Sequence, residues 1–105
     1  MHTIYKYELQ SQRNNIAVPS GAKFLTAHIK TLSSSNGTTD IFYVYALIDK
    51  GKPVETRIID VYATGQLMPE NPGEYIATVF KKSEFFGELV WHIFEYTNTN
   101  EQKPT

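Results

Sequence analysis

Two stretches of this sequence, Ile41–Ile48 (IFYVYALI) and Glu88–Tyr96 (ELVWHIFEY), would be apolar on both faces if they formed strands. A strand of this kind is expected to be covered on both sides. Because no convincing helix of ten or more residues is predicted elsewhere, helices cannot supply the second layer. An outer face partly exposed to water, loops folded over that face, or a second protein chain are the three alternatives.

Shorter β-branched and aromatic runs, separated by turn residues, predict the other strands. We expect strands at residues 2–9, 23–31, 41–48, 54–64, 75–80 and 88–96, with a short extended piece around Ile16 and Val18. The polar segments 10–15 and 31–40 are predicted to be connections, residues 81–87 a loop or a single helical turn, and residues 49–53 a hairpin turn. The fold class is therefore all-β: a small antiparallel sandwich or barrel of six to seven strands, with little or no helix.

The length of 105 residues suits one domain, which we place at residues 1–97. The polar tail, residues 98–105, is expected to fray. The alternation of apolar and polar side chains predicts a largely buried core made of Leu25, Ile29, Val44, Ala46, Ile59, Val61, Val79, Leu89, Trp91 and Ile93.

Composition narrows the classes of function. The chain has no cysteine, which fits a reducing compartment, and no signal peptide or membrane-spanning stretch is recognisable. We therefore expect a cytoplasmic protein without a membrane partner. With 10 basic and 11 acidic side chains and no basic cluster, nucleic acid is not an expected partner.

No catalytic motif is present. The sequence lacks a nucleophile elbow, a P-loop, a dinucleotide fingerprint and a paired-carboxylate motif. Its three histidines, His2, His28 and His92, form no metal-binding spacing. The expectation is a protein that is not an enzyme, with no catalytic residues, no cofactor and no metal.

Five residues are candidates for binding: Arg57, Tyr62, Thr64, Trp91 and His92. The planar guanidinium of Arg57 suits a carboxylate or phosphate, although an ion pair with Glu55 or with a neighbouring strand is the alternative. Tyr62 and Thr64 end a strand beside a proline-rich loop, where binding sites are often built. Trp91 and His92 are expected either in the core or at a ligand. His92 and Glu95 are three residues apart, so a strand places them on opposite faces and they cannot pair locally.

Several segments resemble a family of small uncharacterised proteins from bacteriophage and bacterial genomes. They are TIYKYEL (3–9), PSGAKFL (19–25), VYALID (44–49), ETRIIDVYATGQLMP (55–69), GEYIATVF (73–80) and GELVWHIFEY (87–96). The family pattern is similar to YKYEL, ETR, Y-x-TG and VWHxFE in that order. Ala63 stands where a glycine is usual and Gln66 where a histidine is usual, which weakens any catalytic role inferred from relatives.

The resemblance implies a phage or prophage accessory protein in the host cytoplasm, with no established activity. We expect such a protein to act by binding, with a host protein as the partner. Countering host defence is one role that this binding would serve. Self-association into a homodimer would also cover the second apolar face. A small-ligand binder, for a nucleotide-like signal, is the alternative function, and a small hydrolase is the third.

Overall fold

The computed structural model describes residues 1–97, and the predicted tail 98–105 lies outside the described residues. Seven strands follow one another along the chain: β1 (His2–Leu9), β2 (Arg13–Pro19), β3 (Lys23–Ser34), β4 (Gly37–Asp49), β5 (Val54–Ala63), β6 (Glu74–Ser83) and β7 (Gly87–Tyr96). Residues 1–97 contain no helix, which confirms the predicted all-β class.

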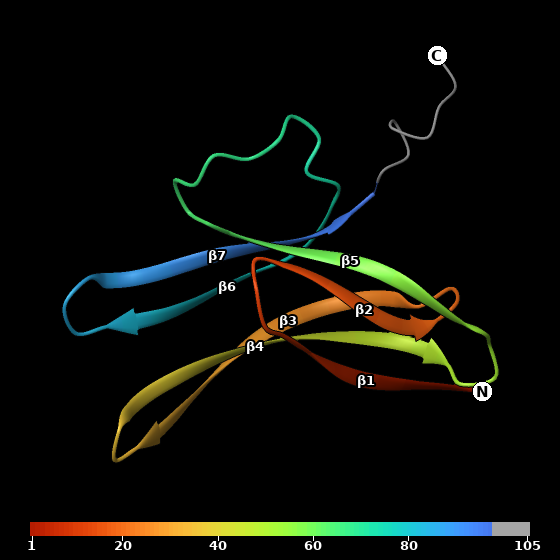
Figure 1. Ribbon diagram of the computed structural model, residues 1–105, viewed down its shortest axis with the longest axis horizontal. Coiled ribbons are helices and arrows are strands. Elements are labelled where there is room, and N and C mark those ends of the chain that lie inside the picture. Colours follow the sequence, from red (N-terminus) through yellow and green to blue (C-terminus); the bar gives the residue numbers. More distant parts are fainter. Residues whose placement is uncertain (98–105) are drawn as a thin grey trace.

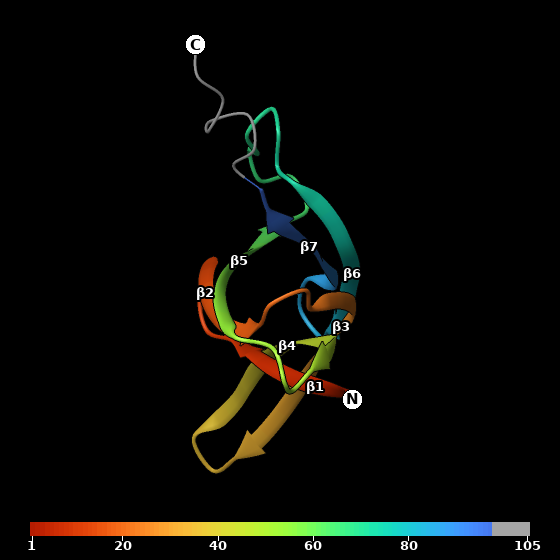
Figure 2. The same cartoon turned by 90° about the vertical axis from the view of Figure 1, so that its right-hand side faces the viewer.

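The strands form two antiparallel sheets that stack as a sandwich and do not close into a barrel (Figures 1 and 2). One sheet has the order β1-β4-β3 and the other the order β2-β5-β7-β6. The two strands predicted to need cover on both sides, β4 and β7, are inner strands of these sheets. Each has a strand on either side of it in its sheet and the opposite sheet across the core.

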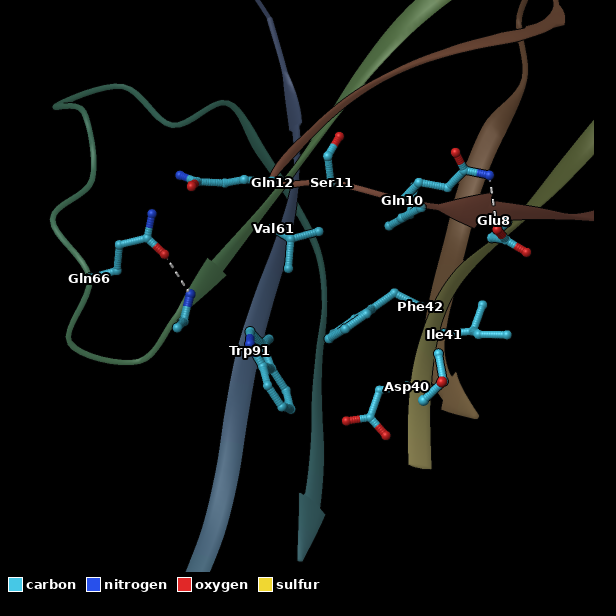
Figure 3. Close-up of a pocket in the computed structure, with 13 residues that line it drawn as sticks. Glu8, Gln10, Ser11, Gln12, Asp40, Ile41, Phe42, Val61, Gln66 and Trp91 are labelled. Carbon is cyan, nitrogen blue, oxygen red and sulfur yellow. Dashed lines mark hydrogen bonds between the residues drawn. The ribbon is translucent and has the colours of Figure 1, made fainter. Parts of the chain in front are cut away.

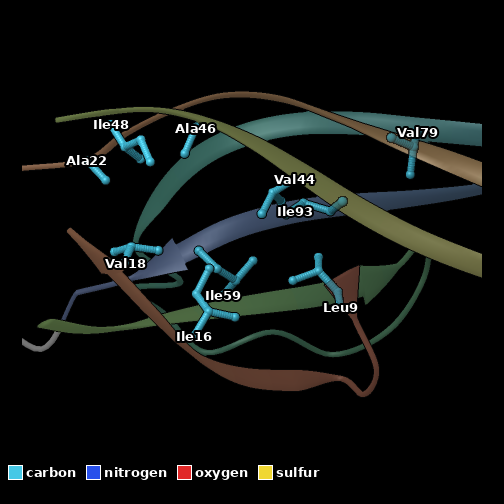
Figure 4. Close-up of a cluster of buried hydrophobic side chains, with 10 residues drawn as sticks. All are labelled: Leu9, Ile16, Val18, Ala22, Val44, Ala46, Ile48, Ile59, Val79 and Ile93. Atoms are coloured by element: carbon cyan, nitrogen blue, oxygen red, sulfur yellow. The ribbon is translucent and has the colours of Figure 1, made fainter. Parts of the chain in front are cut away.

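The core lies between the sheets and follows the predicted alternation along β4 and β7 (Figure 4). Its fully buried or nearly buried members are Leu9, Ile16, Val18, Ala22, Val44, Ala46, Ile48, Ile59, Val79 and Ile93. Of the other residues predicted to be largely buried, Ile29, Val61, Leu89 and Trp91 are only partly buried. These four lie toward the ends of the sandwich or near its edges, where one neighbouring layer is missing.

Leu25 is a wrong core prediction, because its side chain is 41% exposed. The register between β3 and β4 shifts between Phe24 and Thr26, so Leu25 is the extra residue of a β-bulge. A bulge reverses the alternation on one side of it. Phe24 therefore faces the core in place of Leu25, while Ala27 and Ile29 keep their predicted orientation.

The polar segment 31–40 is not a loose connection. Strands β3 and β4 continue through it as a paired hairpin up to Ser34 and Gly37. Gly37 has φ +117°, a conformation that glycine adopts without strain and that lets the chain reverse within two residues. The tight turn between the two strands is formed by Ser35 and Asn36. The hairpin projects beyond the opposite sheet (Figure 2).

Three other connections also differ from prediction. Strand β2 begins at Arg13, earlier than expected, because buried Asn14 supplies hydrogen bonds to the backbone of the preceding turn. Residues 50–53 do not close a hairpin but carry the chain from one sheet to the other. Strand β6 continues to Ser83, so only residues 84–86 form the turn before β7.

The proline-rich connection of residues 64–73 arches over the outer side of the β2-β5-β7-β6 sheet (Figures 1 and 2). It ends at Gly73, whose φ is +102°. A Cβ atom at this position would lie 2.0 Å from the backbone oxygen of Glu95. The absence of a side chain at Gly73 is thus what lets the connection return directly against β7.

Candidate functional site

A pocket of about 580 Å³ opens at one end of the sandwich, between the two sheets (Figure 3). Its walls come from the end of β1, the β1–β2 turn, residues 39–42 of β4, the end of β5, the connection that follows β5 and the middle of β7. The lining residues are Glu8, Leu9, Gln10, Ser11, Gln12, Thr39, Asp40, Ile41, Phe42, Val61, Ala63, Gln66 and Trp91. The volume lies within the range of small-molecule sites.

The floor of this end pocket is apolar. Phe42 and Trp91 pack edge to face, with ring centroids 5.1 Å apart and an interplanar angle of 86°. Leu9 and Val61 complete the apolar surface. Such a floor suits a flat apolar or aromatic group.

The indole N–H of Trp91 has no hydrogen-bond partner within residues 1–97. No fully buried side-chain nitrogen or oxygen in that range lacks a partner, so this N–H is reachable by solvent. Tryptophan side chains that are partly buried usually place their N–H on an acceptor. Trp91, a residue of the pocket wall, therefore carries a donor that no side chain or backbone group of the described residues uses.

Buried Asn14 holds the β1–β2 wall of the pocket in place. Its side-chain oxygen accepts hydrogen bonds from the backbone N–H groups of Gln10 (2.8 Å) and Ser11 (3.0 Å). Its amide nitrogen donates to the carbonyl oxygen of Ile59 at 3.1 Å. The backbone N–H of Val61 also donates to the carbonyl of Gln12 at 2.8 Å. The turn is consequently fixed to β5 and is not a free loop.

The rim of the pocket carries carboxylates and amides and no cationic side chain. Glu8 accepts a hydrogen bond from the side chain of Gln10 at 2.9 Å. Gln66 uses its side-chain oxygen to accept from the backbone N–H of Ala63, which leaves its NH₂ group without a partner in the described part of the chain (Figure 3). The rim thus combines carboxylate acceptors with amide groups that can donate or accept.

Asp40, on the opposite side of the rim, is fixed by a bridge between the sheets. Lys81 of β6 donates to both carboxylate oxygens, at 2.7 and 2.8 Å, and Thr31 donates to one of them at 2.8 Å. The hydrogen bond from Lys81 and, less strongly, that from Thr31 lower the pKa of Asp40 below its ordinary value. At neutral pH the carboxylate is therefore charged and mostly neutralised by Lys81.

This bridge predicts a pH-dependent contribution to stability. Since the pKa of Asp40 is lower in the folded state, the contribution is present at neutral pH and is lost as the pH falls below about 4. We expect Lys81→Met to lower the free energy of unfolding by about 1 kcal/mol at pH 7 and by clearly less at pH 3. Urea denaturation at both pH values measures this. Lys52→Met, at an exposed turn, is the control, and an equal loss at both pH values would contradict the assignment.

Of the five residues predicted to bind, only Trp91 lines the end pocket. Arg57 lies on the core side of β5 toward the other end of the sandwich. It forms hydrogen-bonded ion pairs with Glu95 of β7 and with Glu55, and its guanidinium carbon lies 5.0 Å from the ring centroid of Phe24. The predicted alternative, an ion pair with Glu55 and a neighbouring strand, is confirmed. A second pocket of about 350 Å³ borders this cluster.

The other three predicted residues belong to the outer side of the β2-β5-β7-β6 sheet. Tyr62 is buried there, with its ring 6.1 Å from that of Phe94, and burial raises the pKa of its hydroxyl. Thr64 and His92 are hydrogen-bonded to each other at 2.8 Å. The expected separation of His92 from Glu95 is confirmed, because Glu95 pairs with Arg57 on the core side.

His92 stands in a chain of hydroxyl groups. The hydroxyl of Thr64 donates to the carbonyl of Val90 and is also hydrogen-bonded to Nε2 of His92. Nδ1 of His92 is hydrogen-bonded to the hydroxyl of Thr78 at 3.1 Å, and Thr78 to the hydroxyl of Tyr75 at 2.7 Å. Both ring nitrogens of His92 therefore have partners.

Around this chain lies a surface that we call the β6–β7 face. The pairing of Tyr75 with Phe94, of Thr78 with His92 and of Phe80 with Val90 places these six residues on one side of the two strands. The β6–β7 turn at the end of this face carries Phe85 and Phe86, which we include in the β6–β7 face. Phe80, Phe85 and Phe86 are 62%, 86% and 77% exposed. Sequence analysis did not single out these phenylalanines, since their strand pattern alone does not distinguish an outer face from a covered one.

The pocket rim was also missed by sequence analysis. Glu8 of β1, Asp40 of β4 and Gln66 of the connection after β5 are remote in the chain and meet only because the sheets stack. Asp40 did carry a signal, as the last polar residue before the apolar run of β4. Within residues 1–97, no three histidine, aspartate or glutamate side chains gather where they could hold a metal ion. No helix long and apolar enough to cross a membrane occurs in that range either.

The model of the family described as "Domain of unknown function (DUF7352)" matches residues 1–104, so the chain belongs to that family. This agrees with the resemblance to an uncharacterised family seen in the sequence. No curated protein and no solved structure matches the chain.

Proposed function

We propose that this member of the DUF7352 family acts by binding another protein through its β6–β7 face. The observation that carries the proposal is the group of exposed aromatic side chains on one strand and its turn: Tyr75, Phe80, Phe85 and Phe86. Single exposed apolar residues are common on protein surfaces, but a contiguous group of aromatics is typical of interaction sites.

The polar groups on the face support the same function. The hydroxyls of Tyr75 and Thr78 and the imidazole of His92 lie among the aromatic rings. Charges stay at the periphery, where Lys82 and Glu88 are paired across the two strands. Aromatic rings surrounded by oriented hydrogen-bonding groups, with charges at the rim, are the usual composition of protein interfaces.

The partner that best fits this face is a different protein with a hollow apolar surface. Phe85 and Phe86 are almost fully exposed at the tip of the β6–β7 turn, so a partner has to receive them in a recess. The end pocket and the pocket beside Arg57 are lined by residues other than these two phenylalanines and are not part of the turn. If the protein is phage-encoded, as the sequence resemblance implies, the partner is a host protein in the cytoplasm, and countering host defence is one such role.

Phe80→Ser tests the proposal. We expect it to weaken binding to the partner by at least about tenfold, because truncating a central aromatic residue of an interface removes a large share of the affinity. The free energy of unfolding should change by less than about 1 kcal/mol, since the side chain is exposed. The partner is first captured from a bacterial lysate and identified, and the affinity is then measured by calorimetry with both purified proteins.

Val54→Ser is the matched control, because Val54 is an equally exposed apolar residue on β5 outside this face. It should leave the affinity unchanged. Equal affinities for wild type and Phe80→Ser would overturn the proposal. So would a mass that doubles with concentration in light scattering for wild type but not for Phe80→Ser, because the face would then be the contact between two copies of this chain.

A further inference from the structure

We infer that the end pocket is a second binding site, for a small uncharged nitrogen heterocycle of about nucleoside size. This site lies between the sheets and does not depend on the β6–β7 face. Adjacent residues of β7 serve the two regions, since Trp91 points toward the core side and His92 toward the outer side. The inference rests on shape, on the floor and on the rim of the pocket.

The shape and the floor favour a flat ring. The pocket volume of about 580 Å³ is that of small-molecule sites and would be large for one or two bound waters. Figure 3 shows Phe42 and Trp91 close together in the pocket, with polar side chains around them. An aromatic heterocycle placed against these rings would bury its faces on apolar surface and leave its edge to the rim.

The rim determines which edge groups the ring has to carry. Glu8 and Asp40 already accept hydrogen bonds from Gln10, Lys81 and Thr31, and their carboxylate oxygens can accept further ones from donors such as the amino or ring N–H groups of a heterocycle. The indole N–H of Trp91 and the NH₂ of Gln66 are donors that can bond to acceptors of the same ring. A ring whose edge carries both donors and acceptors can bond to both sets of groups, whereas a purely apolar ligand can bond to neither.

The same rim argues against phosphate. The thirteen lining residues include two carboxylates and no lysine, arginine or histidine. Lys81, which contacts the rim residue Asp40, already donates to both of its carboxylate oxygens. A phosphate group would therefore face an excess of negative charge without a compensating partner. The arginine predicted to bind an anion, Arg57, does not line this pocket and is paired with Glu55 and Glu95.

The pocket is suited to binding without large rearrangement. Asn14 fixes the β1–β2 wall to β5, Lys81 fixes Asp40 across the sheets, and the floor is part of the packed sandwich. A site whose walls are already held loses little conformational entropy when a ligand enters.

The experiment uses the single tryptophan of the chain. Its indole N–H gives one resonance in a proton–nitrogen correlation spectrum of the intact protein. We expect adenosine or guanosine to shift this resonance saturably, and the corresponding 5′-monophosphates to bind at least about tenfold more weakly. No saturable shift with either nucleoside, or monophosphates that bind as tightly as nucleosides, would overturn the inference.

Glu8→Gln is the test of the rim, and Glu88→Gln, on β7 but not among the residues that line the pocket, is its matched control. Both side chains are exposed, so both variants should fold as wild type does. Loss of a charged acceptor should raise the nucleoside Kd about tenfold in Glu8→Gln and leave it unchanged in Glu88→Gln. Equal Kd values in the two variants would contradict the role assigned to the carboxylate rim.

Discussion

Gly73→Ala is expected to destabilise the protein by about 3–5 kcal/mol, one of the two largest losses that the structure predicts for a single substitution. Two effects add. A residue other than glycine is strained at φ +102°, and the new methyl group would lie 2.0 Å from the backbone oxygen of Glu95. Because the obstacle is backbone of an inner strand, it cannot move aside as a flexible side chain would. Urea denaturation monitored by circular dichroism measures the loss.

Gly65 provides a control that separates the two effects. It also has a positive φ, +90°, but a Cβ there would meet nothing within 4 Å. Gly65→Ala should therefore cost only the conformational strain, about 1–2 kcal/mol. If the two alanine variants lose the same stability, the close approach of the 64–73 connection to β7 does not exist in solution.

Arg57→Met is expected to cost about 2–4 kcal/mol. The substitution keeps an apolar stem against Phe24 but leaves Glu55 and Glu95 without their shared cation. Glu95 is largely buried, with 13% of its side chain exposed, so its uncompensated charge is poorly solvated. Removing one partner of such a pair is more damaging than replacing both.

The double variant Arg57→Met/Glu95→Leu follows from that asymmetry. It should recover part of the stability lost in the single variant, because no buried charge is left without a partner. Thermal and urea unfolding of wild type, both single variants and the double variant give the coupling between the two residues. A double variant whose loss equals the sum of the two single losses would show that the ion pair does not stabilise the fold.

Much of the fold could be predicted from the sequence because period-2 alternation is a local property. The faces of β4 and β7 follow the pattern of their residues, and β1 has the predicted bounds. The bulge at Leu25 could not be predicted in this way. An extra residue leaves the composition of the strand unchanged, but it reverses which side of the sheet the residues before it face. The 31–40 hairpin was missed because its serines and threonines resemble a loop. The sequence Asn36-Gly37 is a known turn signal, but the turn lies one residue earlier, at Ser35 and Asn36.

The candidate sites were less predictable than the fold. Arg57, Tyr62, Thr64, Trp91 and His92 all lie on β5, β7 or just beyond them, yet neighbouring residues of a strand point to opposite sides. Arg57 thus lies on the core side at one end of the sandwich, and Trp91 lines the pocket at the other end. The remaining three residues lie on the outer side of the sheet. Which side of a strand is covered depends on how the two sheets stack, and that information is spread over contacts between segments distant in the chain.

The projecting β3–β4 hairpin has a consequence for how the molecule moves. From Lys30 to Thr39 its backbone groups bond to one another, but its side chains are exposed and no second layer shields them. The same two strands are buried in the sandwich only a few residues further on, at Ile29 and Phe42. Each strand is thus rigid at one end and free to bend at the other. The hinge falls at the Thr31–Asp40 hydrogen bond, beside the pocket wall that Lys81 fixes at Asp40, so the arm bends beyond that wall.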